Sequence, residues 1–128
     1  MADLVHPFLS KKFVGNPTSI GTSADRYENF LMAGEQVQME FKGLRDAAVF
    51  TDRRMLVIDP QGLRGKKVSV SSFPWKAITA FSLENSGTFD LDAELKICGS
   101  GWGVCELMFT KGVDVSKVAQ FINEKVFG

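Results

Sequence analysis

Short segments in which apolar and polar residues alternate are the feature that most constrains the fold of this chain. Val37, Met39 and Phe41 alternate with polar neighbours, and this period of two is typical of a strand with one buried face. Turn-forming residues separate the segments; Asp59-Pro60-Gln61-Gly62, for example, has proline second and glycine last, as in a type I turn. We therefore predict strands at about residues 35–42, 46–51, 54–59, 66–73, 78–84, 93–98 and 104–110.

The connections between these seven strands are too short for parallel crossovers, which need about a dozen residues or more. The predicted topology is therefore an antiparallel meander, arranged as a sandwich or a partly open barrel. The strand Arg54–Asp59 contains the apolar run Met55-Leu56-Val57-Ile58. A strand that is apolar at consecutive positions is expected to be covered on both faces.

A C-terminal helix is predicted at about residues 114–126, with Asp114 as its N-cap. Its apolar residues fall on one stripe, which consists of Val115, Val118, Ala119, Ile122 and Val126. A lone helix of this length is only marginally stable in water. The stripe is therefore expected to dock across the open end of the barrel.

A shorter amphipathic helix is predicted at about residues 22–33. Thr22 or Ser23 suits the N-cap position, and Asp25 stands three residues after Thr22, as in a capping box. Gly34 suits the position that follows the last turn of a helix.

The length of 128 residues fits one domain with its own core, which we place at residues 22–128. Residues 1–21 have no sustained period and contain two prolines and two glycines, so we predict an irregular N-terminal arm.

Fifteen basic residues balance fifteen acidic ones, and this balance gives no reason to expect nucleic acid or an anionic membrane as partner. We recognise no targeting or membrane-spanning segment, so a cytoplasmic location is expected.

The two cysteines, Cys98 and Cys105, flank a glycine-rich loop with the sequence GSGWG. Pairing Ile97 with Cys105 sets apolar residues opposite one another along both strands. Pairing the two cysteines directly would instead place Lys96 opposite Leu107 on the same face, which a half-buried sheet disfavours. The register therefore predicts two free thiols.

Seven antiparallel strands followed by one helix is the element order of the pleckstrin homology (PH) fold. The local sequence narrows the comparison, because several runs resemble those of the bacterial PH-domain family in order and spacing. These runs are Gly34-Glu35, Arg45-Asp46, Phe50-Thr51-Asp52-Arg53-Arg54, Gln61-Gly62, Phe73-Pro74 and Phe89-Asp90-Leu91-Asp92-Ala93-Glu94-Leu95. The resemblance covers about residues 34–127.

The resemblance implies a mainly β, PH-like fold with a seven-stranded antiparallel barrel or sandwich and a C-terminal helix. It also implies a scaffold without a catalytic motif, in a family whose members tend to form rings of identical subunits. Phosphoinositide-binding relatives use a basic row between their first two strands. The corresponding loop here, Lys42–Asp46, is short and carries an acid beside Arg45. Specific phosphoinositide binding is therefore not expected.

Residues with catalytic or metal-binding chemistry have no partners placed near them by spacing. His6 is the single histidine, and a general base or metal site needs neighbouring groups. Asp90, Asp92 and Glu94 alternate and are a candidate cation site, although a solvated strand edge explains the same acids. The GSGWG loop is followed by a strand, not by the helix N-terminus that a phosphate loop needs. We expect neither an enzyme nor a cofactor.

Five basic residues come from neighbouring turns and form a candidate anion contact: Arg53, Arg54, Arg64, Lys66 and Lys67. Acids in the same stretch favour the alternative of a solvated surface of mixed charge. Binding of an anionic ligand or a membrane surface through these turns, or of a small molecule by the barrel, remains an alternative function.

The function that we favour is a module for self-assembly or for interaction with another protein. The helical wheel places Phe121 about 120° from the apolar stripe and Phe127 on the other side, while Trp102 lies in the GSGWG loop. Aromatic residues of this kind, together with open sheet edges, are typical of an interface. We therefore predict a non-enzymatic interaction module that acts as a cyclic homo-oligomer, with Phe121, Phe127 and Trp102 at its interface.

Overall fold

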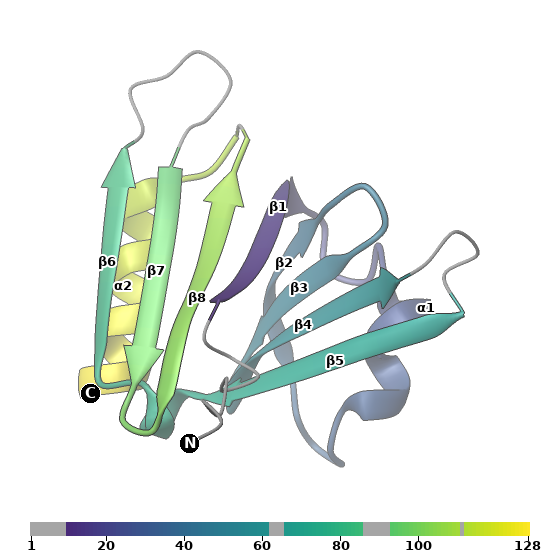
Figure 1. The fold of residues 1–128 in the computed structure, drawn as a ribbon, viewed down its shortest axis with the longest axis horizontal. Coiled ribbons are helices and arrows are strands. Elements are labelled where there is room, and N and C mark those ends of the chain that lie inside the picture. Colours follow the sequence, from purple (N-terminus) through teal and green to yellow (C-terminus); the bar gives the residue numbers. More distant parts are fainter. Residues whose placement is uncertain (1–9, 62–65, 86–92, 111) are drawn as a thin grey trace, which may run out of the picture.

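The computed structural model describes residues 10–61, 66–85, 93–110 and 112–128. Figure 1 shows these residues as a curved sheet, with the C-terminal helix packed against one half of it. The strands are β1 (Ser10–Thr18), β2 (Val37–Lys42), β3 (Ala47–Thr51), β4 (Arg54–Gln61), β5 (Lys67–Pro74), β6 (Ala80–Asn85), β7 (Ala93–Gly99) and β8 (Trp102–Phe109). The α-helices are α1 (Ala24–Tyr27) and α2 (Val115–Phe127), and the 3-10 helices are η1 (Glu28–Phe30) and η2 (Trp75–Ala77).

The eight described strands form one sheet in the order β5-β4-β3-β2-β1-β8-β7-β6. In Figure 1, β2 to β5 form one half of the sheet, β6 to β8 form the other, and β1 lies between them. Seven of these strands are the ones that the alternating segments predicted. The mainly β fold with a C-terminal helix is thus confirmed, whereas the strand count is eight instead of seven.

The eighth strand is β1, which occupies residues 10–18 of the predicted irregular arm. Its residues 10–15 pair in parallel with β8, and its residues 16–18 pair antiparallel with β2. The predicted all-antiparallel meander and the arm are therefore wrong here. The change of partner follows Gly15, where a Cβ atom would lie 2.5 Å from the carbonyl oxygen of Lys42. Glycine usually weakens a strand, but at position 15 the absence of a side chain allows the two backbones to approach closely.

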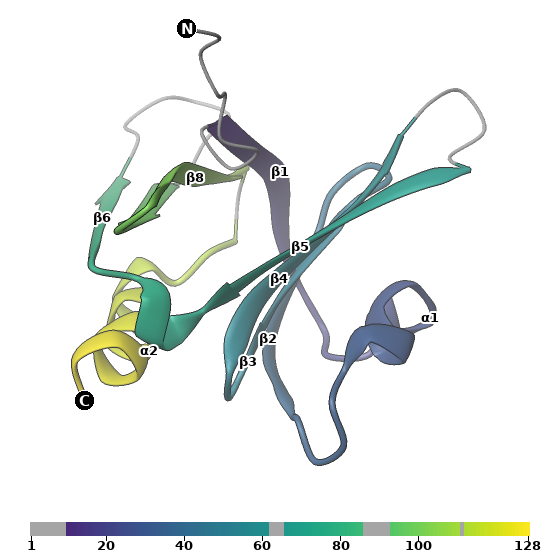
Figure 2. The same cartoon turned by 60° about the horizontal axis from the view of Figure 1, so that its bottom comes forward.

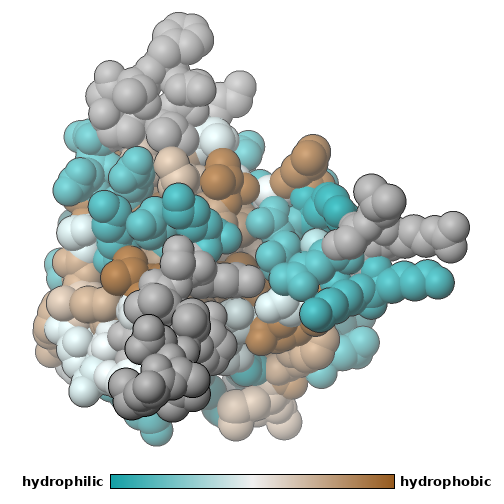
Figure 3. All heavy atoms as spheres, in the orientation of Figure 1, coloured by the Kyte–Doolittle hydropathy of each residue, from teal (hydrophilic) through white to brown (hydrophobic). Residues whose placement is uncertain are grey.

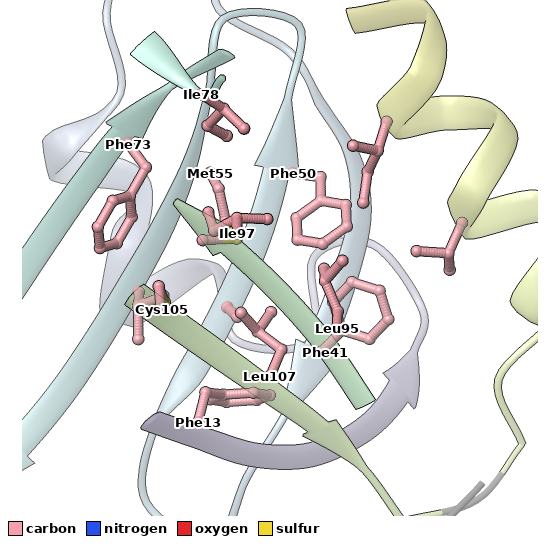
Figure 4. Packing of buried hydrophobic residues seen from close by; sticks show 14 of the residues in the cluster. Phe13, Phe41, Phe50, Met55, Phe73, Ile78, Leu95, Ile97, Cys105 and Leu107 are labelled. Carbon is pink, nitrogen blue, oxygen red and sulfur yellow. The ribbon is translucent and has the colours of Figure 1, made fainter. Parts of the chain in front are cut away.

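The hydrophobic core lies between the two halves of the curved sheet, and Figure 4 shows side chains from both halves directed toward one another. The ring of Phe41 lies 4.9 Å from that of Phe50 and 4.7 Å from that of Phe109, measured between centroids. Phe50 also meets Trp75 edge-on at 5.4 Å. These four rings come from β2, β3, β8 and η2, so aromatic packing joins the two halves of the sheet.

Helix α2 packs against β6 and η2, as Figures 1 and 2 both show. The Asp114 side chain accepts a hydrogen bond from the Lys117 N–H at 3.1 Å and caps the first turn. Val118 and Ile122 are buried in the core. The predicted helix, its N-cap and its buried stripe are confirmed.

The predicted N-terminal helix of residues 22–33 is present only as α1 followed by η1. Ser23 stands at the N-cap but makes no side-chain capping bond, so the capping box is absent. The segment instead covers the outer face of the sheet, where Tyr27 packs with Val49, Leu56 and Ile58. This cover buries the apolar run of β4 on both faces, as its sequence predicts.

The hairpin of β7 and β8 has the predicted register, with Ile97 opposite Cys105 and Cys98 opposite Val104. Neighbouring residues of a strand face opposite sides of the sheet. Cys105 is accordingly buried, Cys98 is partly exposed, and both are free thiols.

Candidate functional site

A buried ion pair joins the segment before β2 to the start of β4. Arg54 donates from Nε to Glu35 Oε2 at 2.9 Å and from Nη2 to Oε1 at 2.8 Å, the two-bond geometry in which guanidinium–carboxylate pairs are strongest. The Thr51 hydroxyl and the Met32 N–H donate to the same carboxylate at 2.6 and 2.9 Å. Because the Glu35 side chain is 0% exposed, this pair belongs to the interior of the protein.

The pKa of Glu35 records this environment. Burial by itself raises the pKa, but hydrogen bonds from Arg54, Met32 and Thr51 and the positive charge of Arg54 outweigh burial and lower the pKa from 4.5 to about 2. Arg54 also donates to the Phe30 carbonyl and to the Ser72 hydroxyl. Its guanidinium is thus occupied by partners inside the domain, which argues against Arg54 as the predicted anion contact.

A second buried carboxylate, Glu40, holds the α1 segment to the sheet. It accepts hydrogen bonds from the Gly21 N–H at 2.8 Å, the Ser23 N–H at 2.7 Å and the Tyr27 hydroxyl at 2.6 Å. Burial, together with the hydrogen bond and the negative charge of Glu40, raises the pKa of Tyr27 well above 10. The alternation in β2 predicts that Glu40 faces water, but it is 2% exposed because α1 covers that face.

Two of the remaining predicted basic residues, Lys66 and Lys67, lie far from Arg54. Arg54 pairs with Pro74 at one end of the β4–β5 ladder, and Gln61 pairs with Lys67 at the other. The two ends of such an eight-residue strand are about 23 Å apart. Arg53 is therefore remote from Lys66 and Lys67, and Arg64 lies outside the described residues.

Several predicted positions fall where the structure describes no side chain. His6, Asp90 and Asp92 lie outside the described residues, and Trp102 is described only as the first backbone position of β8. Glu94 lies in β7 opposite Met108. Within residues 10–61, 66–85, 93–110 and 112–128, no three metal-ligating side chains come together. In the same ranges, no helix has the length and apolar content needed to cross a membrane.

The two predicted interface residues of α2 differ in their surroundings. The Phe121 ring stacks on Phe50 at 5.9 Å and meets Trp75 edge-on at 5.7 Å, so it packs half-buried against the core of its own domain. Phe127 is 65% exposed and lies 6.2 Å from Phe81 of β6. Phe121 is thus half-buried within its own domain, whereas Phe127 is the more exposed of the two predicted interface residues.

The two terminal strands of the sheet present open edges. In the described part of the chain, β5 pairs only with β4, and β6 pairs only with β7. On β5, Val68 and Val70 are 47% and 36% exposed. Alternation of these two valines with polar residues predicts the strand, but it does not predict that they lie at an open edge.

Grooves of about 310, 630 and 530 Å³ lie at three places on the surface. The first lies between β2 and the N-terminal end of α2, and the second lies beside the turn from β2 to β3. The third lies where the β3–β4 turn, η2 and the C-terminal end of α2 meet, and Arg53, Lys76 and Lys125 line it. We call this third groove the cationic groove.

The surface in the orientation of Figure 3 carries hydrophobic side chains in separate places among hydrophilic ones. Single exposed apolar residues are ordinary on a soluble domain. A functional surface on this protein is therefore better identified from open backbone edges and charge than from a large apolar patch on this face.

The described residues form a curved, mainly antiparallel sheet in two halves with a C-terminal helix packed against it, which is the architecture of a PH-like domain. The chain belongs to the bacterial PH-domain family, whose sequence profile matches residues 9–126. The match includes β1, which the resemblance seen in the sequence had left out.

Named relatives and solved structures agree with this family. The Bacillus subtilis (strain 168) protein "Uncharacterized protein YjqA" is 47% identical over 90 residues, which are 69% of this chain and 72% of YjqA. A DUF1696 family protein with a pleckstrin-homology domain from Shewanella loihica PV-4 has a TM-score of 0.77 at 36% identity, covering 90% of this chain and 99% of that one. A pleckstrin homology domain from Shewanella amazonensis SB2B has a TM-score of 0.66 at 38% identity, covering 88% and 92%.

Proposed function

We propose that this protein is a non-enzymatic assembly module, in which the β5 edge of one copy meets the β6 and α2 side of the next in a cyclic homo-oligomer. The observation that carries the proposal is that the single sheet ends in two strands whose outer edges are unpaired among the described residues. Unpaired edges invite association with other strands. A head-to-tail contact between two different edges closes into a ring when the rotation between copies permits it.

The backbone of β5 is arranged to pair outward at alternate residues. Trp75 directly follows β5, and its N–H donates to the Arg53 carbonyl at 3.2 Å. This N–H therefore points toward the β4 side of the strand. In an antiparallel ladder the direction of bonding alternates along the strand. The N–H groups of Val70 and Ser72 therefore point away from β4, toward the open edge.

Side chains at both edges support the same contact. Val68 and Val70 expose apolar surface on β5, and Phe127 exposes its ring beside β6. Edge strands in monomeric proteins are usually protected by charge, bulges or a covering loop. Burying these three side chains between copies would protect both edges at once.

The polar interior supports a structural role over a catalytic one. The two buried carboxylates, Glu35 and Glu40, are saturated by hydrogen bonds from their own domain. A general acid or base must instead reach a substrate. We therefore place the function in the surface of the domain and not in its interior.

The test is the solution mass of wild type and edge variants, measured by light scattering after size-exclusion chromatography. Wild type is expected to be larger than one subunit. Val70→Pro removes an outward N–H. It should lower the association constant by about tenfold or more, which corresponds to the loss of one or two backbone hydrogen bonds. The matched Val70→Thr variant keeps the N–H and the β-branched shape and should still assemble.

Mixing two defective variants tests whether the two edges meet each other. Val70→Pro retains the β6 side, and Phe127→Asp retains the β5 edge, so their mixture should form a two-subunit species that neither variant forms alone. A mixture that stays at the mass of one subunit contradicts the head-to-tail contact. A wild-type mass of one subunit across micromolar concentrations contradicts assembly altogether.

A further inference from the structure

We propose that the cationic groove binds a phosphate monoester through Arg53, Lys76 and Lys125. Its volume of about 530 Å³ is within the range of small-molecule sites. The three cations come from the β3–β4 turn, η2 and the C-terminal end of α2, which are distant in sequence. Only the packing of α2 onto the sheet brings them to one groove.

The charge in the groove is mostly uncompensated. Arg54 also lines it but is neutralised by Glu35 at 2.8 Å. Among the described residues of the lining, Asp52 is the single acid. It lies 4.0 Å from Arg53 and accepts a hydrogen bond from the Gln36 N–H at 2.9 Å. No ion pair with a described residue holds Lys76 or Lys125. Three cations therefore face one acid that already has a backbone partner.

The cations are partly held in place before any ligand arrives. Lys125 Nζ lies 5.5 Å from the centroid of the Phe121 ring, a cation–π contact. Arg53 Nη1 lies 3.5 Å from the sulfur of Met32. Groups that are positioned in advance lose less conformational entropy when a ligand binds.

The chemistry of the lining favours a phosphate over a carboxylate. A phosphate monoester carries a charge of about −1.5 to −2 at pH 7 and has three acceptor oxygens, which match one guanidinium fork and two ammonium groups. Met32 and Pro74 add exposed apolar surface to the same groove. The expected ligand therefore joins a phosphate to an apolar or ring-shaped group.

This groove is separate from the turn between β2 and β3. That turn, at residues 43–46, precedes β3, whereas Asp52 and Arg53 come directly after β3, at the opposite end of the strand. The absence of a basic row in the β2–β3 turn therefore places no limit on the cationic groove.

The experiment is a titration of ¹⁵N-labelled protein with phenyl phosphate, followed by NMR. The Trp75 indole N–H, which donates to the Thr51 carbonyl at 2.8 Å, reports from the wall of the groove. Wild type should show saturable shifts at Trp75, Lys76 and Arg53. Lys76→Ala and Lys125→Ala should each weaken binding by about threefold to tenfold, as expected for partly exposed charge-assisted contacts.

The matched control is Lys67→Ala, which removes one exposed lysine at the far end of the β4–β5 ladder and should leave the affinity unchanged. Equal weakening by Lys67→Ala, or no saturable shift at Trp75 and Lys76, overturns the proposal. If a single variant loses its native spectrum, Lys76→Gln provides the same charge change with a longer side chain.

The phosphate monoester could belong to a lipid headgroup or to a soluble organic phosphate. Vesicles that contain phosphatidate distinguish these two ligands. Co-sedimentation of wild type that is lost in Lys76→Ala assigns the site to a lipid headgroup. Phenyl phosphate binding without co-sedimentation assigns it to a soluble organic phosphate. Failure of both arms refutes the phosphate site and leaves the assembly proposal untouched, because the solution mass tests that proposal separately.

Discussion

Arg54 and Glu35 hold the segment before β2 against the start of β4 through two charge-assisted hydrogen bonds of 2.9 and 2.8 Å. The carboxylate side chain is completely buried and the arginine side chain is 18% exposed. A buried charge that loses its partner is strongly destabilising, because its desolvation is no longer compensated. The stability of the domain should therefore depend strongly on this pair, which attaches residues 30–36 to the sheet.

Glu35→Gln is expected to lower the free energy of unfolding by about 3 kcal/mol, because Arg54 then keeps its charge without a carboxylate. Urea unfolding measures the loss. Glu28→Gln, which changes an exposed glutamate of η1, is the control and should change the free energy by less than about 0.5 kcal/mol. A similar loss in both variants would show that the ion pair is not the cause.

The stability of wild type should fall in acid because the folded pKa of Glu35 is lowered from 4.5 to about 2. Above pH 4.5 the carboxylate is ionised in both states, and its contribution is fully present. Between pH 4.5 and 2 the unfolded chain takes up a proton that the folded chain does not, so about 3 kcal/mol is lost. Urea midpoints at pH 6, 4 and 3 should therefore converge for wild type and Glu35→Gln.

Tyr27→Phe should lower the free energy of unfolding by about 1–2 kcal/mol, because Glu40 loses one of three donors to a buried carboxylate. The variant also tests the alkaline side. Folding raises the pKa of Tyr27, so its contribution is present below pH 10 and is lost as the pH rises above 10. The decline in stability between pH 9.5 and 11 should be smaller in Tyr27→Phe than in wild type.

Two thiols should react with Ellman's reagent in unfolded protein that has not been reduced, since the register of β7 and β8 keeps Cys98 and Cys105 on opposite faces. In native protein only the partly exposed Cys98 should react promptly, whereas Cys105 is buried and should react at the rate of unfolding. Cys98→Ser should abolish the fast phase. The absence of reactive thiols after unfolding would disprove the predicted register.

Phe121→Ala should destabilise the domain by about 2 kcal/mol, because the ring packs against Phe50 and Trp75. Phe127→Ala should cost less than about 1 kcal/mol, since that side chain is 65% exposed. Thermal or urea unfolding at a concentration too low for assembly compares the two. Equal costs would mean that Phe121 contributes no more packing than an exposed residue.

Much of this fold is predictable from local sequence. Alternating or continuous apolar segments between turn residues located seven strands, because such patterns depend on the strand itself and not on its neighbours. The same reasoning gave the register of Cys98 and Cys105, since a shift of one residue would have buried Lys96. The stripe and N-cap of α2 are likewise local, and both are present in the structure.

The eighth strand and the surfaces of the domain depended on tertiary structure. β1 contains Gly15 and Pro17, which weaken any local strand pattern, and it forms because β8 and β2 supply partners on its two sides. Glu40 alternates like a solvent-facing residue, yet α1 covers it.

Long-range packing decided the role of individual charged and aromatic residues. Arg53 and Arg54 are adjacent in sequence and both line the cationic groove, but only Arg54 forms an ion pair with Glu35. Phe121 lies off the main stripe of α2, and the rings of Phe50 and Trp75 extend far enough to meet it. Periodicity within one element determines which residues share a face, whereas the partners that cover that face come from elsewhere in the chain and are known only once it has folded.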